Sequence, residues 1–313
     1  MNCLDVGRFR ISGLLIGILK HDKIGYAEQR LIEIGRSRGH VVEIINPLNI
    51  VLGDGVLKYD VIISRAEINS FREDVTDAYF RLLEYFESIG VPVINSARSL
   101  LISQDKFRTH FVMRQNNISV PNSVLVHGIK SVWNSLKGQI RYPFVIKKPY
   151  GGRGEGVFVI NNIDELRKAE ISFTDSSAVL VQDYIELETN EDGCFRDMRI
   201  WVCRDPETEI PVFLGGFYRN ASSGSYLTNL SRNGIITPII NYDDNVIKMA
   251  ETVLDAIGAD VAGIDIARDC HGALYFLEAN ASFDTTQESV NAVGVDVWSM
   301  VMDLAENRTM KMM

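Results

Sequence analysis

The chain has 313 residues, 46% of them hydrophobic and 23% charged, a composition typical of a globular protein with two or three lobes. Its formal net charge of -9 argues against a general nucleic-acid binder, which normally carries a basic surplus. The four cysteines form no C-x-x-C pair, and no apolar run approaches the ~20 residues of a membrane span, so we expect a cytoplasmic protein without structural zinc or a membrane partner.

The first third of the chain alternates between strand and helix patterns. Apolar runs at residues 13–19, 41–47, 59–65 and 91–95 predict strands, and periodic segments at residues 26–40 and 76–90 predict helices between them. Such alternation predicts a parallel sheet with helices on both faces, an α/β domain that we expect to span residues 1–103. Ser103 is then expected to cap a further helix, which ends at Asn117.

The rest of the chain is richer in strands. Residues 142–161 have the pattern of a strand, a glycine-rich loop and a strand, followed by a helix at residues 163–169 and a strand at residues 178–186. The last third predicts strands at residues 196–203, 211–219, 263–269 and 274–280, with helices at residues 243–257 and 297–305. We expect a second domain at residues 104–184 and a third at residues 185–313.

The segment KKPYGGRGEG carries the first chemical signal. Its glycines allow close backbone approach, so successive N–H groups could converge on an anion. They are Gly151, Gly152, Gly154 and Gly156. Because strands flank the loop on both sides, neither the dinucleotide-binding fingerprint nor the Walker A motif fits, since both need a helix to follow. Lys147, on the entering strand, could reach a nucleotide phosphate; a flexible turn without a ligand is the alternative.

Other polar positions carry weaker signals. Lys106 lies in the first turn of the helix that follows the first domain, and residues 182–185 end an apolar strand with groups that could face a purine. Cationic and amide side chains recur at strand ends, which suggests local neutralisation of phosphate or carboxylate. They are Arg199, Arg219, Asn229 and Arg232. Taken singly, each could be a surface residue, and residues 182–185 could equally form a hinge between lobes.

The segment YFLEAN places two oxygen donors at the end of an apolar strand. Glu278 and Asn280 are two residues apart and point the same way, whereas Ala279 points to the other face. Asp265 lies in another apolar strand, where a carboxylate must be paired or metal-bound. If the two strands form a hairpin, the three donors converge into a set that suits Mg²⁺ with ATP. Otherwise Glu278 and Asn280 are solvated residues where a strand meets a loop.

The order of these segments resembles the ATP-grasp superfamily. Within it, the run from the lysine-bearing helix through FVIKKPYGGRGEG, VLVQDYI, DMR, TNLSRNG and GIDI to LEANAS is most similar to RimK-type amino-acid (glutamate) ligases. The resemblance covers essentially the whole chain. It implies an α/β protein with an ATP-grasp fold and an N-terminal parallel α/β (pre-ATP-grasp) domain.

The resemblance also implies a role for each candidate residue. Lys106 and Lys147 would contact ATP, and the loop at residues 151–156 would close over its phosphates. The adenine slot would be lined by Gln182, Asp183, Tyr184 and Ile185. The catalytic arginines Arg199 and Arg219 would face an acyl phosphate, with Asn229 and Arg232 near the nucleotide or the substrate. Asp265, Glu278 and Asn280 would bind one or two Mg²⁺ ions, or Mn²⁺ in their place.

The implied reaction is an ADP-forming ligation of an amine to a carboxylate through an acyl phosphate. The substrates would be an amino acid and a carboxylate of a metabolite, peptide or protein, and the relatives suggest a homo-oligomer. Phe283 and Asp284 stand where relatives tend to have Pro-Gly, so substrate identity does not carry over. A small-molecule kinase on the same scaffold and a non-catalytic nucleotide-binding module are the alternatives.

Overall fold

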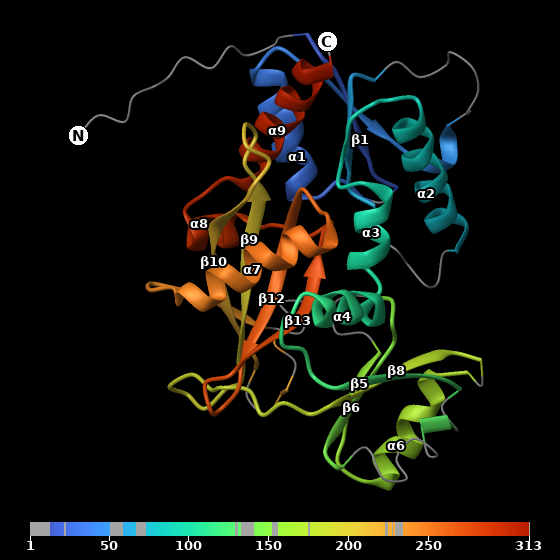
Figure 1. Cartoon of the computed structure of the whole chain (residues 1–313), viewed down its shortest axis with the longest axis vertical. Helices are drawn as coiled ribbons and strands as arrows, with labels where there is room; N and C mark the ends of the chain where they lie inside the picture. Colours follow the sequence, from blue (N-terminus) through green and yellow to red (C-terminus); the bar gives the residue numbers. More distant parts are fainter. Residues whose placement is uncertain are drawn as a thin grey trace.

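Three β-sheets follow one another along the long axis of the molecule (Figure 1). The computed structural model describes residues 13–312 except residues 22, 51–58, 67–72, 129–130, 133–140, 152–155, 175, 223–224, 227 and 229–233. The sheets come from the first, second and last thirds of the chain, and the last third also returns to the first through its C-terminal helix.

The N-terminal sheet has four parallel strands in the order β2-β1-β3-β4, as the alternation of strands and helices predicted. Its strands are β1 (Leu15–Leu19), β2 (Val41–Ile45), β3 (Val61–Ser64) and β4 (Val93–Ile94). The helices are α1 (Tyr26–Ser37), α2 (Glu73–Ser88) and α3 (Ala97–Ser103), with a 3₁₀ turn at Pro47–Asn49. Strand residues alternate between a core shared with α1 and a core shared with α2, so helices cover both faces.

The central sheet is antiparallel, with the order β5-β8-β6-β7. Helix α4 (Lys106–Gln115) leads into it, and its strands are β5 (Ser123–His127), β6 (Phe144–Lys147), β7 (Val157–Ile160) and β8 (Ala178–Asp183). Helix α6 (Ile163–Ala169) and the 3₁₀ turn Glu170–Ser172 lie beside it. The predicted strand–loop–strand around the glycines is confirmed, because β6 and β7 pair directly.

The C-terminal sheet is also antiparallel, with the order β11-β10-β9-β12-β13. Its strands are β9 (Arg196–Arg204), β10 (Pro211–Asn220), β11 (Ile235–Pro238), β12 (Val261–Arg268) and β13 (Leu274–Asn280). Helix α7 (Asp244–Ile257) covers one face; Asp243 caps its start, and Gly258, with a left-handed φ of 65°, ends it. Helices α8 (Gln287–Val293) and α9 (Val297–Met312) follow β13.

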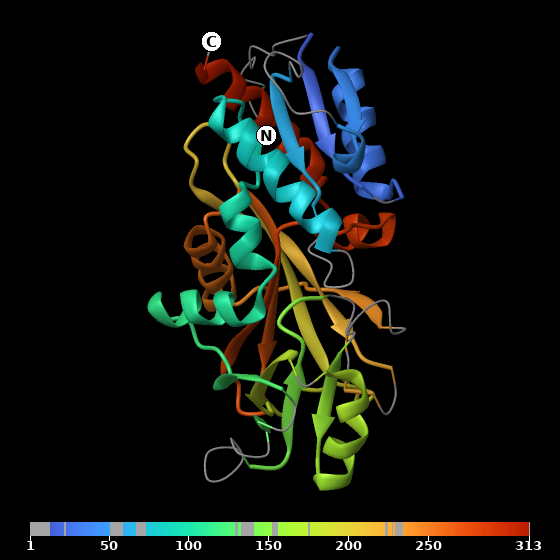
Figure 2. The same ribbon diagram turned by 90° about the vertical axis from the view of Figure 1, so that its right-hand side faces the viewer.

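The hydrophobic cores join the first and last thirds of the chain. One core packs α2 against α7 and the C-terminal sheet, and a second packs β1 and α1 against α9. The central sheet has a core of its own, built from residues such as Phe144, Ile146, Leu166 and Val181. Figure 2 shows the same division, with α9 beside the N-terminal sheet and the central sheet at the opposite end. The domain boundaries near residues 103 and 184 stay predictions.

Some local predictions were wrong. Ser103 is not a helix cap: it is the last residue of α3, and the cap of α4 is Asp105, whose side chain accepts from the backbone N–H groups of Phe107 and Arg108. Aspartate is as good a cap as serine, and the short α3 hides the break between the two helices. The pattern also missed α3, α8 and β11, and α9 runs on to Met312. Within the described ranges, no helix is both long and apolar enough to cross a membrane.

Candidate active site

A cleft of about 820 Å³, open solvent included, lies between the central and C-terminal sheets. Most of the predicted site residues line it: Lys106, Lys147, Gly151, Gln182, Asp183, Ile185, Arg219, Asp265 and Glu278. Gly156, Tyr184, Arg199 and Asn280 belong to the same strands and loops but are not among the described lining residues. Gly152, Gly154, Asn229 and Arg232 lie outside the described residues.

Lys106, on α4, contacts both the glycine-rich loop and β13. It begins α4 directly after the Asp105 cap, and only 10% of its side chain is exposed. Its ammonium nitrogen Nζ donates to the carbonyl oxygen of Gly151, at the start of the glycine-rich loop, and lies 3.2 Å from Glu278 Oε1 on β13. The lysine therefore faces both the loop and the predicted metal ligand.

Lys147 ends β6 and points into the same cleft. Burial of its ammonium group and, next, the charge of Lys106 lower the pKa of Lys147 to about 8, and Glu278 partly offsets both effects. Two buried ammonium groups with one carboxylate between them leave local positive charge. A polyphosphate is the kind of anion that would compensate it.

The predicted adenine wall is formed by the end of β8. Gln182 is 2% exposed, and its amide nitrogen Nε2 donates to Ser123 Oγ at 3.0 Å and lies 3.4 Å from His110 Nδ1. Burial lowers the pKa of His110 to about 3, so its ring is neutral near pH 7. Asp183 and Ile185 line the cleft, whereas Tyr184 stacks on Tyr226 at a centroid distance of 4.9 Å. This wall thus combines an apolar side chain, Ile185, with a few fixed hydrogen-bonding groups.

The hairpin expected between the two acidic segments is confirmed. Asp265 on β12 pairs directly with Glu278 on β13, and Gly263 pairs with Asn280. Directly opposed residues of an antiparallel pair share a face, so Asp265, Glu278 and Asn280 lie together. Ala279 faces the other way into the core under α7, where it is 1% exposed.

Both predicted catalytic arginines are anchored by carboxylates on this face. Arg199 forms a bidentate pair with Asp265: its Nε donates to Oδ1, and its Nη2 donates to Oδ2 at 3.0 Å. Arg219 pairs with Asp197 at 2.8 and 2.6 Å, and its Nη2 also lies 2.9 Å from Asp265 Oδ2. Burial alone would lower the pKa of Arg219, but Asp197 and Asp265 outweigh it and raise the pKa. Both guanidinium groups are therefore fixed in direction by hydrogen-bonded carboxylates.

The three predicted metal ligands fit a hard divalent cation. Carboxylate and amide oxygens are the donors that Mg²⁺ prefers. The amide nitrogen Nδ2 of Asn280 is buried with no hydrogen-bond partner among the described residues. Since a carboxamide can be rotated to exchange nitrogen and oxygen, its carbonyl can take that position and meet a cation. Asp265 already forms ion pairs with Arg199 and Arg219, so only part of its negative charge would act on the cation. No cluster of three or more His, Cys, Asp or Glu residues in the described part of the chain is arranged for a metal.

The sequence analysis missed three residues that line the cleft, Asp197, Tyr226 and Thr228, and His110 behind its wall. Asp197 is 3% exposed and anchors Arg219, and Thr228 donates to Asp197 Oδ2 at 2.7 Å. Tyr226 packs on Tyr184 and donates from its hydroxyl to the carbonyl of Ile185 at 3.0 Å. His110 bridges α4, β8 and β13. Only Asp197 had a sequence signal, the D-x-R spacing that places it on the same strand face as Arg199.

Two antiparallel sheets that face each other across a cleft, with lysines on one side and carboxylates with arginines on the other, define a protein of the ATP-grasp class. A crystal structure of a RimK domain protein ATP-grasp from Sphaerobacter thermophilus superposes with a TM-score of 0.69 at 19% identity, covering 92% of this chain and 98% of that one. The VanG D-Ala:D-Ser ligase from Enterococcus faecalis superposes with a TM-score of 0.73 at 16% identity, covering 95% of this chain and 100% of that one. These likenesses show the fold.

The sequence comparisons give the family. The model of the RimK-like ATP-grasp domain matches residues 103–304. A probable alpha-L-glutamate ligase of Pseudoalteromonas translucida is 28% identical over 312 residues, covering 93% of this chain and 95% of that protein. The ribosomal protein bS6–L-glutamate ligase of Salmonella schwarzengrund is 30% identical over 289 residues, covering 85% and 87%. The chain therefore belongs to the RimK-like ATP-grasp family, and it is an ATP-dependent ligase that forms a carbon–nitrogen bond.

Proposed function

We propose that this ligase joins the amine of an amino acid to a carboxylate of a peptide or protein, and that L-glutamate is the first amine to test. The names of the relatives support this choice of amine, and the bS6–L-glutamate ligase supports a protein acceptor. The observation that carries the proposal is the cleft itself, which faces Lys106 and Lys147 towards Asp265, Glu278 and Arg219. The chemistry of phosphoryl transfer to a carboxylate needs cations at the phosphates and at the acyl group.

The first step is attack of the acceptor carboxylate on the γ-phosphate of ATP, which gives an acyl phosphate and ADP. Lys106 and Lys147 bind the phosphates and reduce the repulsion between the two anions. The glycine-rich loop that Lys106 contacts through Gly151 closes over them, so that water does not reach the acyl phosphate.

In the second step the amine attacks the acyl carbon, the bond to phosphate breaks, and the amine proton is released. Arg199 and Arg219 neutralise the charge that develops on the acyl oxygens. Because Asp197 and Asp265 already hold both guanidinium groups, this requires little reorganisation. Asp265, Glu278 and Asn280 would hold the divalent cation, one ion or two, which supplies charge neutralisation at the transferring phosphoryl group when bound.

A phosphate-release assay with Mg²⁺–ATP across paired panels of amino acids and carboxylates tests the proposal, with mass spectrometry of the products. We expect phosphate only when an amine and a carboxylate are both present, and a product heavier by one amide-linked residue. Phosphate transfer to a lone hydroxyl compound, without an amide, would show a kinase instead. Binding of ATP without formation of ADP or phosphate, with every pair of compounds, would show a non-catalytic module.

A cytoplasmic location and a homo-oligomeric state belong to the same proposal. The described cysteines Cys194, Cys203 and Cys270 are free thiols, which suits a reducing compartment. Burial raises the pKa of the Cys203 thiol, so this cysteine packs as a small apolar residue. Sedimentation of the purified protein would give the oligomeric state.

A further inference from the structure

The turn at residues 281–284 directly follows the predicted metal ligand Asn280, and the N-terminal domain holds it at three points. Asn95, just after β4, donates from its side-chain Nδ2 to the carbonyl of Ala281. Arg65, just after β3, donates from Nη1 to the carbonyl of Phe283 at 2.8 Å and from Nη2 to Asp284 Oδ1 at 3.0 Å. Residues that directly follow β3 and β4 thus hold in place the turn that follows the C-terminal sheet.

Arg65 has little freedom to point elsewhere. The residue is 1% exposed, and its Nε donates to Glu28 Oε1 at 2.6 Å. Glu28 is itself fully buried near the start of α1, where it accepts from the Gly25 N–H at 2.7 Å. The guanidinium carbon lies 4.8 Å from the ring centroid of Trp298 on α9. A buried, planar donor held on three sides fixes direction as well as charge.

Phe283 connects the turn that Arg65 holds to the residues of the predicted site. Its ring is 3% exposed, stacks on Trp298 at 5.4 Å and lies 5.8 Å from Trp201. A methyl group added to Gly263 would lie 3.2 Å from Phe283 Cγ and 2.9 Å from Arg199 Cδ. The phenyl ring and the stem of Arg199 therefore both flank the space above Gly263, the residue paired with Asn280.

We propose that Arg65 is a positioning residue for the ligation. Through the turn at residues 281–284 it fixes the direction of Asn280 on one side and, through the Phe283 ring, of Arg199 on the other. The inference rests on the proposed function, since it assigns Asn280 and Arg199 their roles from it. It also gives the Phe283–Asp284 pair a purpose: the ring flanks the space over Gly263 that the stem of Arg199 also flanks, and the carboxylate accepts from Arg65.

The test compares two buried arginines that join the N-terminal domain to the end of the chain. Arg65→Lys keeps a charge for Glu28, but a single ammonium group does not reproduce the fork that reaches Phe283 and Asp284. Arg38→Lys is the matched control, because Arg38 pairs with Asp303 at 2.8 Å and Glu306 at 3.1 Å on α9 and is not bonded to the turn. Asp284→Asn, at a largely exposed side chain, removes the charge from one acceptor and is a milder probe.

Two measurements are made on the full chain. Hydrogen exchange of the nucleotide-free protein reports the turn, and calorimetry with Mg²⁺ and the non-hydrolysable analogue AMPPNP reports the site. We expect Arg65→Lys to speed exchange at residues 281–285 and to weaken Mg²⁺–AMPPNP binding by about 10-fold or more. Asp284→Asn should change both readouts in the same direction and by less, whereas Arg38→Lys should bind within about 2-fold of the wild type.

Three results would overturn the role of Arg65. They are wild-type affinity in both Arg65→Lys and Asp284→Asn, an equal loss in Arg38→Lys, and an unchanged exchange rate at the turn. If Arg65→Lys does not fold, Asp284→Asn against Arg38→Lys decides alone. Failure of the wild-type protein to bind Mg²⁺–AMPPNP would count against the proposed function instead, and the exchange data would still show whether Arg65 holds the turn.

Discussion

Glu278 is the residue on which the proposed site depends most directly, because it faces Lys106 and is paired with Asp265. Glu278→Gln keeps the size of the side chain and removes its charge. We expect turnover with Mg²⁺–ATP to fall by about 100-fold or more, since a neutral amide is a poor ligand for the cation. The phosphate-release assay measures the rate, and circular dichroism checks the fold.

Glu33→Gln is the control for this change, because the Glu33 side chain is exposed on α1, where it pairs with Arg30 of the same helix. It should turn over like the wild type. A wild-type rate in Glu278→Gln would remove the metal assignment from this residue.

Gly263 tests how closely Arg199 is placed. Gly263→Ala adds a methyl group 2.9 Å from Arg199 Cδ, close enough that the arginine side chain must shift relative to Asp265. We expect turnover to fall by roughly 100-fold, as a small displacement of a catalytic group often does. The decisive measurement is a double-mutant cycle with Arg199→Ala: the two changes should be far from additive if they act on the same group. Additive losses would place the effect of Gly263 elsewhere.

At the scale of elements, helix α4 connects both walls of the cleft through His110. The ring lies 3.4 Å from Gln182 Nε2 on β8 and 3.3 Å from the carbonyl of Leu277 on β13, edge-on to Phe276. Burial, with Lys147 as the next cause, lowers the pKa of His110 from 6.5 to about 3. Below pH 6.5 the unfolded chain therefore binds a proton that the folded protein does not.

This difference predicts a loss of stability in acid. The His110 contribution to the free energy of unfolding should fall as pH drops from 6.5 towards 3, by about 1.4 kcal/mol per pH unit. Urea unfolding of the wild type and of His110→Gln at pH 7.5, 6.5 and 5.5 measures this contribution. These values are about one pH unit above, at and below the pH where the contribution begins to fall. The difference in free energy of unfolding between the two proteins should shift in favour of the glutamine variant as the pH falls. Parallel pH curves would contradict a neutral, buried His110.

Much of this arrangement could be predicted from element patterns, and the misses have physical causes. Period-two alternation was enough to place Asp265, Glu278 and Asn280 on one face, since pairing of β12 with β13 follows from a short connection. Arg65 gave no signal, because its partner Phe283 is 218 residues away and the contact depends on how two domains dock. Tyr226 and Thr228 lie in a segment without periodicity, so only the folded chain brings them to the cleft.

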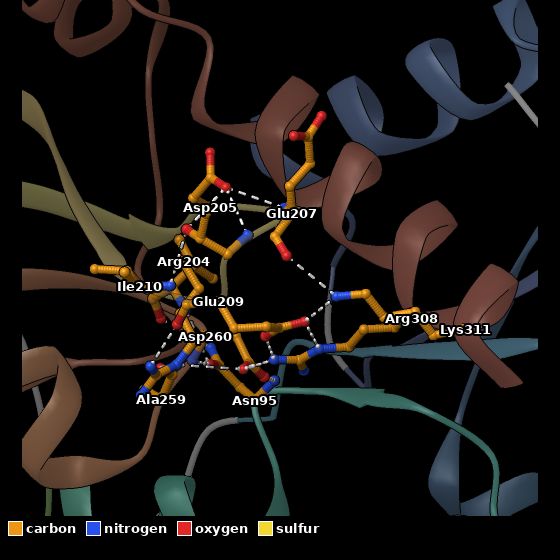
Figure 3. A network of polar contacts seen from close by, with 12 residues as sticks. Asn95, Arg204, Asp205, Glu207, Glu209, Ile210, Ala259, Asp260, Arg308 and Lys311 are labelled. Atoms are coloured by element: carbon orange, nitrogen blue, oxygen red, sulfur yellow. Dashed lines mark hydrogen bonds and ion pairs between the residues drawn. The ribbon is translucent and has the colours of Figure 1, made fainter. Parts of the chain in front are cut away.

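At the scale of the whole molecule, the N-terminal and C-terminal parts share cores and the central sheet does not. A polar network reinforces the junction: Asn95 of the N-terminal part donates from its backbone N–H to Asp260, which Arg308 on α9 holds at 2.6 Å while also donating to Glu209 at 2.6 Å (Figure 3). The C-terminal sheet of this joined unit forms one wall of the cleft, and the central sheet, with a core of its own, forms the other wall.

Matched core truncations test this division. Met302→Ala on α9 should lower the free energy of unfolding by about 2–5 kcal/mol and speed hydrogen exchange in both β1–β3 and β9–β12. Ile146→Ala, also fully buried, should speed exchange within β6–β8 and leave the other two sheets unchanged. Faster exchange throughout the molecule in either variant would show a single cooperative unit.

Because α9 packs on the N-terminal domain, this domain cannot complete its core until the end of the chain has been synthesised. The helix packs on α1 and β3, and its Leu304 and Ala305 are fully buried among residues of β1. A ribosome releases β1 nearly three hundred residues before α9, so the apolar surface that α9 covers on the N-terminal sheet and α1 stays exposed until the rest of the chain has been made. A weakened α9 would prolong this exposure, and we expect longer chaperone capture of the newly finished chain as its first effect.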